Sequence, residues 1–107
     1  MKKARIGIIG AGNIAREHTQ AFLAAPSAEL VGLCDRVANR AEEVAKANNL
    51  KTYPDAEAML KDPDIDAVVL AVPNYQHHPM CLAAAAHGKH ILCEKPMALN
   101  VQQAQEM

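Results

Sequence analysis

The sequence predicts a single α/β domain, residues 1–107, built on a doubly wound parallel sheet. Three observations predict this class. Apolar stretches rich in β-branched residues recur along the chain at intervals too wide for hairpins. Each stretch is continuously apolar, as in strands that are buried on both faces of a parallel sheet. Helical patterns fill the intervals, which implies right-handed crossovers between parallel strands, and we expect the strand order 3-2-1-4-5.

Five segments are expected to form the strands. Four are apolar and lie at residues 6–9, 29–34, 67–72 and 90–93, and a short third strand is expected at residues 51–53. Aromatic residues make up only 3% of the chain, and alanine is abundant. The core is therefore expected to consist of small aliphatic side chains, which let helices lie close to a sheet.

The first two helices are predicted from apolar residues at helical spacing. The first pattern runs from Ile14 to Ala25 and stops at Pro26, because proline cannot continue a helix. The second runs over residues 37–48, with arginine and glutamate side chains on the outer face. Both helices fit the intervals that crossovers between neighbouring strands require.

Three shorter helices are predicted mainly from their ends. Asp55 is a suitable N-cap for a helix over residues 56–61. Gly88 is a suitable residue to end a helix over residues 79–87. Asn100 opens the run Asn-Val-Gln-Gln, which resembles the capping box at the start of a last helix.

Composition and charge exclude several classes of protein. With 11 Lys and Arg against 12 Asp and Glu, the net charge is -1 and no basic block indicates nucleic-acid binding. No apolar run approaches the roughly 20 residues of a membrane span. The basic N-terminus resembles a signal peptide, but glycines interrupt the apolar stretch behind it. Three cysteines, an odd count, fit a reducing compartment, so we expect a soluble cytoplasmic protein with buried thiols.

A glycine motif is the strongest local signal. Residues 10–15 read Gly-Ala-Gly-Asn-Ile-Ala, directly after the first strand and at the start of the first helix. In such a loop the first glycine allows a tight turn, and the second lets a pyrophosphate approach the backbone at the helix N-terminus. The alternative is a plain strand-to-helix turn. The residues expected to contact a dinucleotide here are Gly10, Ala11, Gly12, Asn13 and Ile14.

An acidic residue supports dinucleotide binding. Asp35 ends the second strand about 20 residues beyond the motif, where a carboxylate binds the hydroxyls of the adenosine ribose. Its alternative role is to cap the helix that begins near Val37. A carboxylate repels a 2′-phosphate, so NAD is the expected cofactor. NADP remains the alternative, because the neighbouring Arg36 guanidinium can pair with that phosphate.

A zinc site is the competing interpretation for two His-x-x-Cys pairs. They lie at residues 78–81 and 90–93, one at a helix start and the other along a buried strand. Structural zinc sites usually take their ligands from tight turns, so we expect core cysteines and no metal. His18 and His87 are likewise expected on helix surfaces rather than as ligands.

Two further motifs lie at the ends of the fourth and fifth strands, where open α/β sheets bind ligands. One is P-N-x-x-H at residues 73–77, and the other is G-K-H-x-x-x-E-K-P at residues 88–96. Together with the glycine motif they resemble the N-terminal half of the glucose–fructose oxidoreductase/inositol dehydrogenase/MocA family. The resemblance covers essentially the whole chain, and E-K-P at this spacing is a specific signal.

The resemblance implies an oxidoreductase that uses NAD or NADP and acts on a hydroxyl of a sugar, cyclitol or related polyol. It implies that Lys95 lies near the nicotinamide and the reacting hydroxyl, where an ammonium stabilises developing negative charge. An exposed cation at a strand end is the alternative for this residue. The remaining cofactor-binding residues that the resemblance implies are Ala71, Pro73, Asn74, His77 and Glu94.

The chain also departs from the family pattern. Family members are much longer and carry a second α/β domain with the substrate pocket, so we expect a C-terminally truncated Rossmann domain that lacks the sixth strand, within a homo-oligomeric enzyme. Two other functions stay open: an NAD-dependent glycosidase of the same family, and a non-catalytic dinucleotide sensor. The intact Glu-Lys-Pro motif at residues 94–96 favours an enzyme over a sensor.

Overall fold

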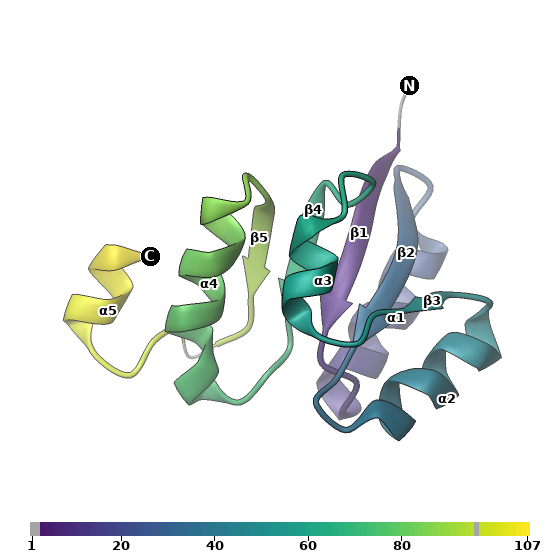
Figure 1. The fold of residues 1–107 in the computed structure, drawn as a ribbon, viewed down its shortest axis with the longest axis horizontal. Coiled ribbons are helices and arrows are strands. Elements are labelled where there is room, and N and C mark those ends of the chain that lie inside the picture. Colours follow the sequence, from purple (N-terminus) through teal and green to yellow (C-terminus); the bar gives the residue numbers. More distant parts are fainter. Residues whose placement is uncertain (1–2, 96) are drawn as a thin grey trace.

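The computed structural model describes residues 3–95 and 97–107. A five-stranded parallel sheet in the order β3-β2-β1-β4-β5 forms its centre (Figure 1), which confirms the predicted class and strand order. The central strand β1 pairs with β2 on one side and with β4 on the other. The strands are β1 (Ala4–Ile9), β2 (Ala28–Cys34), β3 (Lys51–Thr52), β4 (Ala67–Leu70) and β5 (His90–Cys93).

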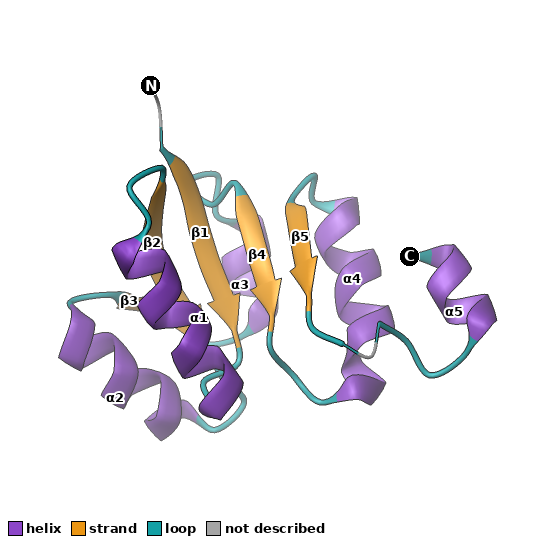
Figure 2. Ribbon diagram, turned by 180° about the vertical axis from the view of Figure 1, so that it is seen from behind, coloured by secondary structure: helices purple, strands orange, loops and turns teal. Residues whose placement is uncertain are grey.

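Helices cover both faces of the sheet. The helical segments are α1 (Asn13–Ala24), α2 (Ala38–Asn48), α3 (Ala56–Lys61), the 3-10 turn η1 (Asn74–Gln76), α4 (His77–Ala86) and α5 (Val101–Glu106). Helices α1 and α2 lie on the face that Figure 2 turns toward the viewer, and α3 lies behind the sheet. Helix α5 packs beside α4 at the far end of the molecule (Figure 1). None of the helices in the described residues is long and apolar enough to cross a membrane.

The core consists of two apolar clusters, one on each face of the sheet. On the α1 and α2 face, Ile8 and Leu33 are fully buried against small residues such as Ala15. On the other face, Met59 and Leu70 are fully buried among residues of α3 and α4. Each such large side chain contributes about 1.5–3 kcal/mol when it is removed from water. The core is therefore built mainly from aliphatic and small side chains, which allow the helices to pack closely on the sheet, as expected.

The predicted helix ends are confirmed. The Asp55 carboxylate accepts the backbone N–H of Ala58 at 2.8 Å and so caps α3. Asn100 caps α5 by accepting the Gln103 N–H at 2.9 Å. At the end of α4, Gly88 adopts a positive φ of 71°, a conformation that glycine reaches without strain.

Several element boundaries differ from the predictions by one or two residues, and the following differences lie near the carboxyl ends of the strands. Strand β4 ends at Leu70 rather than at residue 72, because the chain turns there toward η1. Helix α4 starts at residue 77 rather than 79, and Pro79 fits its first turn, where no backbone N–H is needed. The N-cap of α2 is Val37 and not Asp35, although the Asp35 side chain accepts the Val37 N–H.

The cysteine and histidine predictions hold in part. All three cysteines are free thiols, but only Cys34 and Cys81 are buried, and Cys93 is half-buried because β5 is an edge strand. His87 is exposed as expected. His18 is not a plain surface residue, since its side chain is 19% exposed and pairs with Glu94. Within the described parts of the chain, no three His, Cys, Asp or Glu side chains gather into a group that could hold a metal ion.

Candidate functional site

A groove of about 850 Å³ lies along the carboxyl ends of the strands. Its lining comes from the segments that follow β1, β2, β3 and β4 and from one side of α4. This is the edge at which open α/β sheets bind their ligands. Among the residues predicted from the sequence, the groove is lined by Gly10, Gly12, Asp35, Arg36, Ala71 and Pro73.

The two glycines of the loop serve different purposes. Gly10 has a φ of 116°, and a Cβ there would lie 2.3 Å from the carbonyl oxygen of Ala71, so only glycine fits. A Cβ on Gly12 would meet no atom within 4 Å. Gly12 is also the N-cap of α1, and no side chain caps that helix. The open space over Gly12 and the uncapped helix N-terminus together suit an anionic group that approaches the backbone.

Hydrogen bonds hold the glycine loop against the end of β2. The Gly10 N–H donates to the Cys34 carbonyl at 2.7 Å. The Ala11 N–H donates to Asp35 Oδ2 at 2.8 Å, and the Val37 N–H donates to Asp35 Oδ1 at 2.7 Å. A carboxylate oxygen has two acceptor sites, so each oxygen retains capacity for a ligand hydroxyl. Asp35 therefore combines a structural role in the loop with a free acceptor surface in the groove.

The thiol of Cys34 lines the same part of the groove but is not reactive. Burial, and after it the nearby charge of Asp35, raises the pKa of Cys34 to about 12. The group therefore stays a neutral thiol at physiological pH. It acts as a small apolar part of the wall and not as a nucleophile.

Several groove residues are not anticipated by the sequence motifs. Three of them, Met80, Ala83 and His87, lie at helical spacing on one face of α4, which is the pattern that could have identified them. Arg40 adds a second guanidinium beside Arg36. The other unanticipated lining residues are Ile9, Cys34, Pro54, Asp55, Ala56, Glu57, Leu60, Val72 and Gln76.

The β2 and β4 sides of the sheet edge are linked by an exposed tyrosine. Arg36 Nη1 donates to the Tyr75 hydroxyl at 3.2 Å, and Gln76 Nε2 donates to the same oxygen at 3.2 Å. Arg36 follows β2, whereas Tyr75 and Gln76 belong to η1 after β4. The link places one arginine side chain between two segments that both line the groove.

Of the three defined residues of the P-N-x-x-H motif, Pro73 lines the groove, whereas Asn74 and His77 do not. His77 is 1% exposed, and its Nε2–H donates to the Val72 carbonyl at 3.0 Å. Its buried imidazole therefore stabilises the loop between β4 and α4 from the interior of the domain. Asn74 is half-buried, and its Oδ1 is buried without a hydrogen-bond partner among the described residues. An orphaned acceptor of this kind suits a ligand that brings a donor.

The segment after β5 brings two charged residues to the same edge. The Glu94 N–H donates to the Leu70 carbonyl at 3.2 Å, and Glu94 Oε1 pairs with His18 Nε2 on α1. Lys95 is exposed. Pro96, the last residue of the motif, lies outside the described residues.

Three remaining residues of the glycine motif occupy different environments. Ala11 is buried under the loop, where it packs in the α1 and α2 core cluster. Ile14 is 42% exposed in the first turn of α1. The side chain of Asn13 lies outside the described part of the chain.

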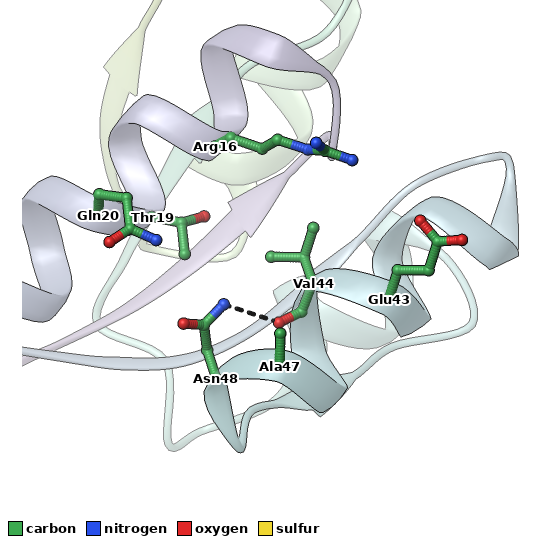
Figure 3. Close-up of a pocket in the computed structure, with 7 residues that line it drawn as sticks. All are labelled: Arg16, Thr19, Gln20, Glu43, Val44, Ala47 and Asn48. Atoms are coloured by element: carbon green, nitrogen blue, oxygen red, sulfur yellow. Dashed lines mark hydrogen bonds between the residues drawn. The ribbon is translucent and has the colours of Figure 1, made fainter.

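A second hollow lies between α1 and α2, away from the predicted site residues (Figure 3). It has a volume of about 260 Å³. Two of its polar side chains are bonded to their own helices: Thr19 Oγ1 donates to the Ala15 carbonyl, and Asn48 Nδ2 donates to the Val44 carbonyl. The groove at the strand ends is therefore the candidate site.

Comparison with known proteins identifies the family of the chain. Residues 4–107 match the family model described as "Oxidoreductase family, NAD-binding Rossmann fold". The chain is 39% identical to 1,5-anhydro-D-fructose reductase of Ensifer adhaerens over 96% of its own length, which is 31% of that relative.

Solved structures give the same result. A myo-inositol dehydrogenase from Lactobacillus casei, in complex with NAD(H) and myo-inositol, superposes with a TM-score of 0.92 at 33% identity. That match covers 97% of this chain and 32% of the other. A 3-ketoreductase from Actinomadura kijaniata, in complex with NADP and TDP-benzene, has a TM-score of 0.93 at 29% identity and covers 98% and 33%.

The chain thus spans about a third of the length of the relatives that it matches. Its sheet order, its glycine loop and the match over residues 4–107 all agree. The chain belongs to the glucose–fructose oxidoreductase/inositol dehydrogenase/MocA family, the oxidoreductases with an NAD-binding Rossmann fold.

Proposed function

We propose that this chain binds a nicotinamide dinucleotide along the groove and provides the cofactor-binding part of an oxidoreductase. The reaction is hydride transfer between the nicotinamide and a hydroxyl of a sugar, cyclitol or related polyol. The observation that carries the proposal is the glycine loop, held to β2 by Asp35 and open above Gly12. The named activities of the relatives support the reaction class.

The pyrophosphate and the adenosine ribose are assigned to the β1 and β2 end. The open space above Gly12 admits a phosphate, and the N-terminus of α1 contributes backbone donors and a favourable dipole. Asp35 is assigned to the ribose hydroxyls, because its oxygens retain acceptor capacity after they hold the loop. Ala71 and Pro73 form the wall that faces these groups.

NAD is the proposed cofactor, with NADP as the alternative. A 2′-phosphate beside the Asp35 carboxylate would meet like charge, which favours NAD. Arg36 and Arg40 line the same part of the groove, and guanidinium groups pair well with phosphate. The preference therefore depends on whether Arg36 leaves its contact with the Tyr75 hydroxyl.

The nicotinamide is assigned to the β4 and β5 end, where it would accept or donate the hydride when bound. Glu94 and Asn74 are proposed to hold its ribose, and His77 to hold the loop that shapes this end. Lys95 is exposed beside them, and its ammonium would stabilise negative charge that develops on the reacting oxygen. Lys95 is therefore the proposed catalytic residue.

The cellular setting and the assembly are proposed from two features of the chain. Three free cysteines fit a reducing cytoplasm. β5 is an edge strand with Leu92 48% exposed, and a free strand edge of this kind favours self-association of the chain. Light scattering over a range of concentrations tests the second point, and a monomer at every concentration would contradict it.

A thermal-shift and calorimetric titration with NAD, NADH, NADP and NADPH tests the proposed function. We expect saturable binding that prefers NAD or NADH. Asp35→Ala should weaken it roughly 10- to 100-fold, because hydrogen bonds to a charged group are lost. Glu43→Ala, which removes an exposed carboxylate from the other side of α2, is the matched control and should bind as the wild type does. A cooperatively folded chain that binds none of the four nucleotides would refute the proposal.

A further inference from the structure

A contact between the first helix and the residue after the last strand lies at the carboxyl end of β5. His18, in α1, pairs through Nε2 with Glu94 Oε1, directly after β5. The two residues are 76 positions apart in the sequence. Their side chains are only 19% and 24% exposed, so water screens this pair less than a surface pair.

The surroundings fix both partners. The ring of His18 stacks on Phe22, with 6.5 Å between the ring centroids and 27° between the planes. The backbone N–H of Glu94 donates to the Leu70 carbonyl, so the main chain of Glu94 stays in register with β4. The histidine therefore determines where one carboxylate oxygen lies.

The second carboxylate oxygen is left for another partner. Glu94 Oε2 makes no hydrogen bond to any residue that the structure describes. When one oxygen of a carboxylate is held, the position of the other is also defined within a small range. Without the histidine, the flexible side chain would be ordered only upon binding, at a cost in side-chain entropy.

We propose that His18 is a positioning residue that acts through Glu94 on the nicotinamide half of the dinucleotide and not on its adenosine half. The inference rests on the proposed function, because Glu94 is assigned there to the nicotinamide ribose. Asp35 and the glycine loop, which are assigned to the adenosine half and the pyrophosphate, make no hydrogen bond to His18 or Glu94 in the described part of the chain.

Two ligands separate the halves. NADH contains both halves, whereas ADP contains the adenosine ribose and the pyrophosphate but lacks the nicotinamide and its ribose. We expect His18→Phe to weaken NADH binding about 10-fold in calorimetry and to change the affinity for ADP less than 2-fold. Asp35→Ala should weaken both ligands to a similar degree.

Rescue and control variants distinguish positioning from a general structural role. His18→Gln keeps an N–H donor for Glu94 and should bind NADH within 3-fold of the wild type. Glu17→Phe, at an exposed neighbouring position on α1, should bind both ligands as the wild type does. If His18→Phe fails to fold, His18→Leu removes the same N–H donor with a smaller side chain and should show the same selectivity for NADH.

The outcomes are distinct. Equal loss of NADH and ADP affinity in His18→Phe, or no loss of either, overturns the inference and leaves dinucleotide binding intact. The same result in His18→Leu would overturn it as well. A wild-type chain that binds neither ligand overturns the proposed function, and the inference with it.

Discussion

The two ends of the groove are built from different kinds of interaction. At the β1 and β2 end, backbone groups define the shape: the Gly10 N–H bonds to Cys34, and the Ala11 N–H bonds to Asp35. At the β4 and β5 end, side chains define it, through the His18 pair with Glu94 and the buried His77. The first end is fixed by chain conformation, and the second depends on contacts between distant residues.

The position of each strand explains the difference. β1 has a neighbour on both sides and is buried over its last four residues. β5 pairs only with β4 among the described strands and alternates between exposed and half-buried residues. At the sheet centre, the backbone hydrogen bonds between neighbouring strands hold the geometry of a site. At an edge strand, additional side-chain contacts are needed to hold it.

Substitution of the two loop glycines tests the first half of this comparison. Gly10→Ala should lower the free energy of unfolding by roughly 3–6 kcal/mol, because it combines a strained φ with a clash against Ala71. Gly12→Ala should leave stability nearly unchanged but weaken NAD binding at least about 10-fold, because its Cβ occupies the space of the pyrophosphate. Urea denaturation and calorimetry measure the two effects. Equal stability of both variants would contradict the distinction.

Removal of the buried imidazole tests the second half. His77→Ala should lower the free energy of unfolding by about 2–4 kcal/mol, because it leaves a cavity and takes a donor from the Val72 carbonyl. His87→Ala, at the exposed end of α4, is the matched control and should change stability by less than about 0.5 kcal/mol. If both variants melt alike, the loop before α4 does not depend on His77.

The smallest change in stability is expected for a substitution at Tyr53, directly after β3 on the β1 and β2 side of the sheet. The Tyr53 hydroxyl donates to Asp62, and this bond, together with the Asp64 N–H, lowers the pKa of the Asp62 carboxyl below its ordinary value. Tyr53→Phe should cost about 1 kcal/mol at neutral pH.

The pH dependence of that effect has a defined sign. A carboxyl whose pKa is lowered in the folded state adds stability above its unfolded pKa and loses it as pH falls through the folded pKa. The difference between wild type and Tyr53→Phe should therefore shrink below about pH 4. Urea titrations at pH 3 and pH 7 measure it, and an equal difference at both values would show that the Asp62 charge plays no part.

The same contrast explains how much the sequence could reveal. The strands, the helix caps at Asp55 and Asn100 and the glycine loop are encoded by neighbouring residues, and all are found, with strand ends that differ from the predictions by one or two residues. The roles of the predicted site residues in cofactor binding stay predictions. The contact of His18 with Glu94 could not be predicted, because a lone histidine on a helix gives no signal of a partner 76 positions away. The sequence does not predict the burial of His77 either, because a motif identifies the residue type but not whether its side chain points into the core or toward the groove.

The strand order has a consequence for how the chain reaches its fold. β1, the first strand along the chain, pairs with β2 through a short connection. Its pairing with β4, in contrast, brings residue 6 next to residue 67. Contacts of large sequence separation carry a high loop-closure entropy and slow the search for the native topology. The β1 and β2 side can therefore assemble early, while β4 and β5 dock later onto this pair of strands. Destabilised variants of the late half should slow the final folding phase and leave the early one unchanged.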